Sequence, residues 1–292
     1  MFDIQQRNST VWREVFGGIT TFMAMSYIIF VQVAFLKGTG MEVGGIIFAT
    51  CVASAVASII MGLLANYPIG LAPGMGENNF FAFALAPGFA VWASQIDGFD
   101  MPGWKPALAL VMLVGVVFLL LSYTGLRSYV INSMPVALRC GVAAGIGLLI
   151  ATVGLSFGNL VTFSGPAPAA VSLADNPCAW LTLVGVLVIL VLTGLRVPGA
   201  VLISITINTV LAMFVFGLIS RPSGVVTHNV FEGVGTTISG GFEGFGGLWK
   251  FLSTTHVTQL IVFAVVLLFM DVFDTIGTLV GVADQAGLMV NG

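Results

Sequence analysis

The sequence predicts an all-α integral membrane protein with about eight transmembrane segments, and three observations lead to this fold class. Of the 292 residues, 58% are hydrophobic and only 7% are charged, and the mean hydropathy is +1.09. Soluble domains carry about 25% charged residues, so this chain cannot cover itself with a water-facing surface. Its net charge of -3 also lacks the basic footprint of a nucleic-acid-binding protein. Most of the surface must therefore face lipid or other helices.

Eight apolar segments approach the roughly 20 residues that a helix needs to cross a bilayer. The third segment is short and irregular. The sixth and seventh are separated only by residues 196–198, so they should form a tight helical hairpin. The eight segments cover residues 16–36, 44–65, 77–92, 106–126, 134–157, 179–196, 198–219 and 257–283.

The distribution of Lys and Arg gives the orientation of these segments, because both residues are enriched in cytoplasmic loops. If the N-terminus is inside, the inner segments hold five of these residues and the outer segments hold four. We therefore expect a multi-pass protein with its N-terminus in the cytoplasm.

A glycine-rich stretch, residues 221–256, separates the seventh segment from the eighth. Its composition predicts a flexible, partly strand-like connection on the outer side of the membrane. A gating role for this stretch is the alternative.

The chain between the second and third segments does not fit an unbroken membrane helix. Within residues 68–76, two prolines remove backbone hydrogen-bond donors and three glycines destabilise a helix. Non-helical backbone at membrane depth is tolerated only where it is buried in protein or lines a wet cavity. We expect this stretch to be extended and a half-helix to begin near residues 76–78, where a helix N-terminus offers a site for a polar ligand. A simple polar loop is the alternative.

Two carboxylates lie inside the otherwise apolar eighth segment. Asp271 and Asp274 are spaced i and i+3, which places them on one face of a helix. Each costs roughly 2.5–3.5 kcal/mol at the centre of a membrane helix, so such residues are candidates for function. They could exchange a proton with a cavity; a structural carboxylate bonded to a neighbouring amide or hydroxyl is the alternative.

Several further polar residues have two interpretations each. Glu77 opens the half-helix, where it suits the helix dipole as a cap as well as a ligand contact. Gln32, together with Thr20, Thr21 and Ser26, gives the first segment a polar side that suits a cavity wall or an interhelical contact. The Thr278 hydroxyl can bond to its own helix or face a ligand.

The chain closely resembles the adenine/guanine/hypoxanthine permeases at two stretches, Ala72–Phe83 and Asp271–Leu279. This family is a branch of the nucleobase–cation symporter superfamily, which includes uracil and xanthine permeases. The resemblance runs from about residue 13 to the end of the chain. Supporting stretches in the same order are residues 17–30, 65–68, 121–127 and 281–287.

The resemblance implies a fold of two inverted seven-helix repeats, with spans one to four and eight to eleven in a core domain and the other spans in a gate domain. Spans three and ten each begin with a short strand, and substrate sits between them. Because span ten should follow Gly292, the chain looks like about two-thirds of a permease, and we expect it not to transport alone. The implied divisions are 1–130 (spans one to four), 131–220 (spans five to seven), 221–256 (outer loop) and 257–292 (span eight).

The resemblance also implies roles for individual residues. Asp274 takes the place of the acidic residue that hydrogen-bonds the base, and a phenylalanine stacks on the base ring. The implied substrate-binding residues are Asn78, Asn79, Phe80, Phe81, Asp274 and Thr278. The implied proton-coupling residues are Glu77, Asp271 and Asp274, and the structural residues are Pro68, Pro73, Gly74, Gly76 and Gly277. No metal or cofactor is expected.

The chain departs from the family pattern beside the implied pocket. By this resemblance, family members usually have Leu where Glu77 stands and a small residue where Asn79 stands, and Val33 replaces a usual Pro. The preferred purine is therefore left open.

The expected function is proton-coupled uptake of a purine nucleobase such as adenine, guanine or hypoxanthine across the bacterial cytoplasmic (inner) membrane. The implied partners are the base, protons and membrane lipid, with no nucleic acid; a homodimer is left open. The alternatives are a channel, a non-transporting receptor and an inactive fragment of a permease. An intramembrane aspartyl protease needs two carboxylates on separate helices that share a proton, whereas Asp271 and Asp274 share one segment. The chain is therefore not expected to be an enzyme.

Overall fold

The computed structural model of the 292-residue chain describes a set of helical segments separated by gaps. The described residues are 10–96, 99–124, 135–162, 168–174, 176–197, 199–215, 231, 233–253 and 257–285. The contacts within the chain divide it into two units. Unit 1 holds residues 1–31, 50–72 and 150–228, and unit 2 holds residues 32–49, 73–149 and 229–292.

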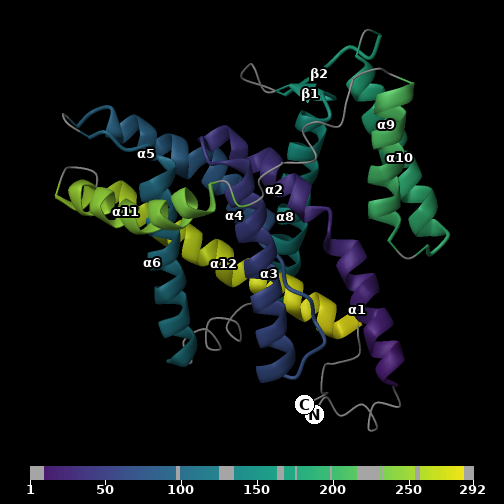
Figure 1. Ribbon diagram of the computed structural model, residues 1–292, viewed down its shortest axis with the longest axis horizontal. Coiled ribbons are helices and arrows are strands. Elements are labelled where there is room, and N and C mark those ends of the chain that lie inside the picture. The colour runs from purple at the N-terminus through teal and green to yellow at the C-terminus, as the bar shows by residue number, and fades with distance from the viewer. Residues whose placement is uncertain are drawn as a thin grey trace. The chain divides into compact units, whose positions relative to one another are not determined.

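Nearly all regular structure in these residues is helical (Figure 1). The longer helices are α1 (Val11–Met25), α2 (Ile28–Leu36), α3 (Val43–Leu64), α6 (Trp104–Tyr123), α8 (Val136–Phe157), α9 (Pro177–Gly194), α10 (Ala200–Phe214), α11 (Val234–Leu252) and α12 (Val257–Gln285). The shorter elements are a 3-10 turn η1 (Lys37–Thr39), α4 (Met75–Phe80), a π-helical segment η2 (Phe81–Leu85), α5 (Ala86–Ala93) and the strands β1 (Val161–Thr162) and β2 (Ala169–Ala170).

Five stretches of the described chain are long and apolar enough to cross a membrane. They are Val11–Thr39, Val43–Leu64, Trp104–Tyr123, Pro177–Gly194 and Val257–Leu279. This confirms the prediction of an all-α, multi-pass membrane protein. The count of eight spans, the inverted repeat and the core and gate divisions stay predictions; the division points near residues 130, 220 and 256 lie outside the described residues.

In unit 1, α9 and α10 pack against each other as the predicted helical hairpin (Figure 1). The turn between them starts with a Schellman motif: the Val197 amide donates to the Leu192 carbonyl at 3.0 Å and the Arg196 amide to the Thr193 carbonyl at 3.0 Å. Arg196 takes the left-handed conformation, with φ 55°, at the position that glycine usually fills.

A strand was expected before the third span, but residues 66–74 form neither helix nor strand. A strand needs a hydrogen-bonded neighbour. The one sheet in the described part of the chain instead pairs β1 with β2 in antiparallel register, Val161 opposite Ala170.

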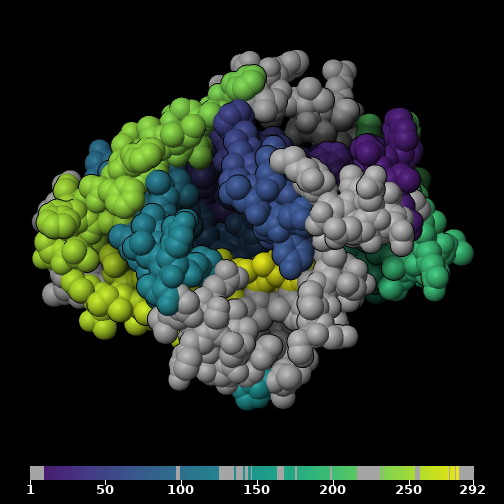
Figure 2. All heavy atoms as spheres, turned by 90° about the horizontal axis from the view of Figure 1, so that it is seen from below, coloured from purple at the N-terminus to yellow at the C-terminus, as the bar shows by residue number. Residues whose placement is uncertain are grey.

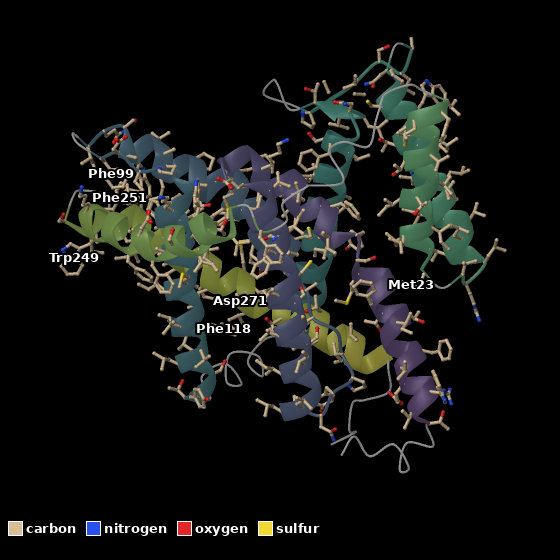
Figure 3. The ribbon with its side chains drawn as sticks, in the orientation of Figure 1. Met23, Phe99, Phe118, Trp249, Phe251 and Asp271 are labelled. Atoms are coloured by element: carbon tan, nitrogen blue, oxygen red, sulfur yellow. The ribbon has the colours of Figure 1, made fainter. Side chains whose placement is uncertain are left out.

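Unit 2 is built around α6, against which α5, α11 and α12 pack. An aromatic cluster joins these helices: Phe89 on α5 lies 5.2 Å from Phe251 on α11, and Trp92 stacks on Phe263 of α12 at 5.3 Å between ring centres. Figure 3 shows Phe251 beside Phe99, whose ring centre is 4.9 Å away. Both Phe89 and Phe251 are fully buried.

The prediction of a flexible, partly strand-like connection over residues 221–256 was wrong for residues 234–252, which form α11. The physical reason for a helix here is the packing of its glycines. Gly240, Gly241, Gly244 and Gly247 are all buried. Glycine is unfavourable in an isolated helix, but here it allows the backbones of α6 and α11 to approach closely.

Candidate functional site

The third span is broken, as the sequence predicts. Residues 66–74 are non-helical, and α4 begins at Met75, one residue before the predicted start, with Gly74 as its extended N-cap (φ -67°, ψ 130°). Pro73 disfavours helical backbone at Ala72, the residue before it, so α4 cannot begin earlier than Pro73. The alternative of a simple polar loop between α3 and α4 stays open, because such a loop would also be non-helical over residues 66–74.

The broken segment obtains hydrogen bonds from α3. The Ser58 hydroxyl accepts a hydrogen bond from the Leu71 amide at 2.9 Å, and it lies 3.3 Å from the Leu71 carbonyl, to which it can donate. Unpaired backbone groups are costly in a membrane, so Ser58 replaces part of what a continuous helix would supply.

The helical part of this span contains a π-helical turn, η2, between α4 and α5. The cause is Pro87 in the first turn of α5, which has no N–H and whose ring would clash with the carbonyl four residues earlier, that of Phe83. The Ala86 amide instead donates to the Phe81 carbonyl. Such π-turns occur often at functional sites.

Gln32 of α2 and Asn78 of α4 form a closed pair of side-chain amides. The Gln32 Nε2 group donates to Asn78 Oδ1 at 3.1 Å, and the Asn78 Nδ2 group donates to Gln32 Oε1 at 2.6 Å. Gln32 is buried, with 5% of its surface exposed. The interhelical interpretation of Gln32 is therefore correct, and Asn78 uses both ends of its amide to fix α4 to the first span.

Two carboxyl groups meet at the start of α4. A Cβ atom added to Gly74 would overlap Glu77 Oε2 and lie 2.9 Å from Asp274 Oδ2 on α12. Glu77 Oε2 is buried, and no described residue donates a hydrogen bond to it. The charges of Asp274 and Asp271 both act on Glu77, and Figure 3 shows Asp271 midway along α12. We call these three acids, with Gly74, the carboxyl cluster.

The other predicted site residues lie around this cluster in different ways. Phe80 is half-buried and meets Phe263 of α12 edge-on at 5.8 Å, whereas Phe81 is buried in the protein core. Asn79 is half-buried. Thr278 is exposed, and its hydroxyl donates to the Asp274 carbonyl at 2.6 Å, so the helix-bonded interpretation of this residue holds.

The structural residues are distributed along both chain stretches. Gly76 has only Met270 Cε, at 3.5 Å, near its missing Cβ, so a side chain at this position would make an ordinary contact with α12. Pro68 lines a cavity in unit 1, described below, and Gly277 lies within α12. Met270 was not anticipated from the sequence, because one methionine in an apolar helix carries no signal.

Unit 1 contains a cavity of about 660 Å³ next to the broken segment. It is lined by α1, α3 and residues 67–72. Its polar groups include the hydroxyls of Thr50, Ser54 and Ser58. The polar side predicted for the first segment contributes Thr21 and Ser26 to this lining, whereas the hydroxyls on α3 were not predicted, because small polar residues are also common at ordinary contacts between membrane helices.

Comparisons with known proteins give consistent results over nearly the whole chain. The sequence profile described as the Permease family, named for xanthine and uracil permeases, matches residues 13–292. The chain is 35% identical to the guanine/hypoxanthine permease PbuO of Bacillus subtilis over 100% of its own length and 63% of that protein. It is 34% identical to the guanine/hypoxanthine permease PbuG of the same organism over 99% of its length and 63% of that protein.

A relative from another organism extends this similarity to a different purine. The adenine permease AdeP of Escherichia coli is 31% identical over 99% of this chain and 59% of its own length. The chain thus spans about three-fifths of the length of the curated relatives that it matches.

Proposed function

Because the chain belongs to the Permease family, in the branch that contains purine permeases, we propose that it takes part in the uptake of purine nucleobases across a bacterial cytoplasmic membrane. Relatives whose names include guanine, hypoxanthine and adenine support this substrate class. The protein is accordingly proposed as a transporter and not as an enzyme.

The carboxyl cluster at the broken span is the observation that carries the proposal. A purine presents ring N–H donors, and an ionised carboxylate is a pure hydrogen-bond acceptor. Asp274 Oδ2 lies 2.9 Å from the position that a Cβ atom on Gly74, the N-cap of α4, would occupy. We assign Asp274 the role of accepting a hydrogen bond from the base.

The same cluster is proposed to hold the coupling proton. Carboxyl groups that occupy one small space can share a proton, and Glu77 feels the charges of both Asp274 and Asp271. Glu77 stands where family members have Leu, so this chain has one more acid beside the site than the family pattern requires.

Contacts divide the residues near the cluster into two groups. Phe80 and Asn79 are half-buried beside α12 and are proposed to face the base, with the Phe80 ring stacking on it. Asn78, bonded to Gln32, and Phe81, buried in the core, are proposed to position α4. Thr278, bonded to its own helix, is proposed to stabilise α12.

Several broader predictions accompany this proposal. The N-terminus lies in the cytoplasm, spans one to four and eight belong to a core domain, and spans five to seven belong to a gate domain. Protons couple to uptake, and the membrane lipid surrounds the spans. A homodimer remains compatible with the proposal.

The test is uptake of labelled adenine, guanine and hypoxanthine by cells that lack their own purine permeases and express the protein from its own gene. The Asp274→Ala variant should abolish uptake at unchanged membrane levels, while Glu243→Gln, an exposed acid on α11, should leave it near normal. A protonophore should prevent accumulation. Near-normal uptake by Asp274→Ala would contradict the assignment, and equilibration without accumulation would favour a channel.

A further inference from the structure

Helix α11 presents three distinct faces along its length. The buried face consists of Thr237, Gly240, Gly241, Gly244, Gly247, Leu248 and Phe251. A second face is apolar and exposed, and consists of Ile238, Phe242, Phe245, Trp249 and Leu252. The third face is exposed and polar or small, and contains Ser239, Glu243, Gly246 and Lys250. At 3.6 residues per turn, each set falls on one continuous stripe.

The buried face lies against the beginning of α6. A Cβ on Gly244 would overlap the Lys105 backbone carbonyl, and one on Gly240 would lie 2.5 Å from the Trp104 ring. Gly241 faces Leu108 and Met112. Figures 1 and 2 show α11 lying across α6, so only the first turns of α6 carry the contact.

That end of α6 marks a membrane surface. With 20 residues, α6 is just long enough to cross a bilayer, so its first residues lie near the headgroups. Trp104, the first residue of α6, is buried against Gly240 of α11. Next to it, Lys105 Nζ lies 2.5 Å from Glu243 Oε2, and this hydrogen bond holds the pKa of Glu243 below its usual range.

The apolar exposed face has no covering partner among the described residues. Trp249 is 73% exposed and Phe242 is 64% exposed. In Figure 3 the Trp249 side chain points away from the ring cluster formed by Phe99 and Phe251. These large rings stand beside a polar face that carries Glu243 and Lys250, and an apolar face next to a polar one is typical of helices that lie in the membrane surface.

We propose that α11 is an in-plane membrane helix whose Ile238, Phe242 and Trp249 face inserts into the lipid at the level of the headgroups and upper acyl chains. The occupant of this face is the same bilayer that the five spans cross. The polar face, with the Lys105–Glu243 ion pair, turns to water. Since α12 begins five residues after Leu252, this anchor also sets the depth at which α12 enters the membrane.

The experiment places one spin label on each exposed face and measures collisions with oxygen, which partitions into lipid, and with a water-soluble nickel chelate. The protein carries Cys51→Ala, Cys140→Ala and Cys178→Ala and is reconstituted in phosphatidylcholine/phosphatidylglycerol vesicles. The lipid-facing labels are Phe242→Cys and Trp249→Cys, and the matched controls on the polar face are Ser239→Cys and Gly246→Cys.

Labels at 242 and 249 should collide several-fold more often with oxygen than with the nickel chelate, and labels at 239 and 246 should show the reverse. Frequent nickel collisions at 242 and 249 would overturn the proposal, because the face would then be in water. Protection from both reagents would also overturn it, because a protein segment or a second copy would then cover the face. All four positions are exposed, so the labels should not impair folding.

Discussion

Gly74 controls the positions of two carboxyl groups, because its missing side chain leaves the space that Glu77 and Asp274 occupy. In Gly74→Ala, both carboxyl groups must shift, and each can do so because it ends a flexible side chain. We expect normal folding but uptake reduced about tenfold or more, since a displaced charged acceptor forfeits roughly 1.5–3 kcal/mol of ligand hydrogen bonding. Labelled-purine uptake at matched expression measures this.

The matched control is Gly76→Ala in the same turn. Its added Cβ would find only Met270 Cε at an ordinary 3.5 Å, so uptake should stay within about twofold of the parent, since a methyl group that fits an existing space causes no overpacking. Equal losses in both variants would indicate damage to α4 and not displacement of the carboxyl groups.

Ser58 is expected to stabilise the broken span through its bonds to Leu71. Ser58→Ala leaves the Leu71 amide without its acceptor, and an unpaired buried donor costs about 1–3 kcal/mol. Thermal unfolding in detergent should therefore occur at a clearly lower temperature. Ser54→Ala is the control, because Ser54 Oγ is buried with no hydrogen-bond partner in the described structure; an equal drop in both variants would refute the role of Ser58.

Single residues differed in how far the sequence could predict them. Asp271 and Asp274 are recognisable because charge is expensive inside an apolar segment. The pairing of Gln32 with Asn78 was not predictable, because 46 residues separate them and nothing local specifies the partner of a buried amide. The meeting of Glu77 and Asp274 also depends on how α4 and α12 pack.

At the scale of elements, glycines on two faces of α11 differ in whether a side chain would fit. Gly244 faces α6, whereas Gly246 is exposed. Gly244→Ala would drive a Cβ into the Lys105 backbone carbonyl, which cannot move as a flexible side chain can. We expect a loss of roughly 1–3 kcal/mol from overpacking. Gly246→Ala has nothing within 4 Å of its added Cβ and should be neutral or gain up to about 1 kcal/mol of helix propensity. The melting temperatures of the two variants measure this difference. A higher melting temperature for Gly244→Ala would contradict the close contact between α11 and α6.

The elements themselves were predictable where hydrophobicity alone decides. The long apolar runs became helices near their expected bounds, such as α9 and α12, because a membrane leaves the backbone few alternatives. The helix α11 was not predicted, because a high glycine content is typical of loops, whereas the spacing of these glycines on one face indicates close contact between helices. The π-helical segment η2 was not predicted, because whether a proline such as Pro87 ends, kinks or widens a helix depends on its neighbours.

At the scale of the whole molecule, the orientation of every later helix depends on whether the broken third segment crosses the membrane. α4, η2 and α5 follow one another from Met75 to Ala93, which corresponds to roughly 28 Å of helix, close to the thickness of about 30 Å of a bilayer core. If this segment crosses and the N-terminus is cytoplasmic, α6 begins on the outer side. The contact of α11 with the first turns of α6 then places α11 outside as well. Without that crossing, both would lie on the inner side.

Labelling of intact cells with a membrane-impermeant thiol reagent tests this arrangement in a background free of the native cysteines. Gly246→Cys, on the polar face of α11, should react from outside, whereas Thr124→Cys, just beyond the other end of α6, should react only after permeabilisation. A tag fused before Met1 should be accessible only from the cytoplasm. Outside labelling of Thr124→Cys together with an inside tag would mean that the segment from Met75 to Ala93 enters and leaves the membrane on one side. The site would then be a re-entrant loop, because only a crossing third segment gives an odd number of spans before α6.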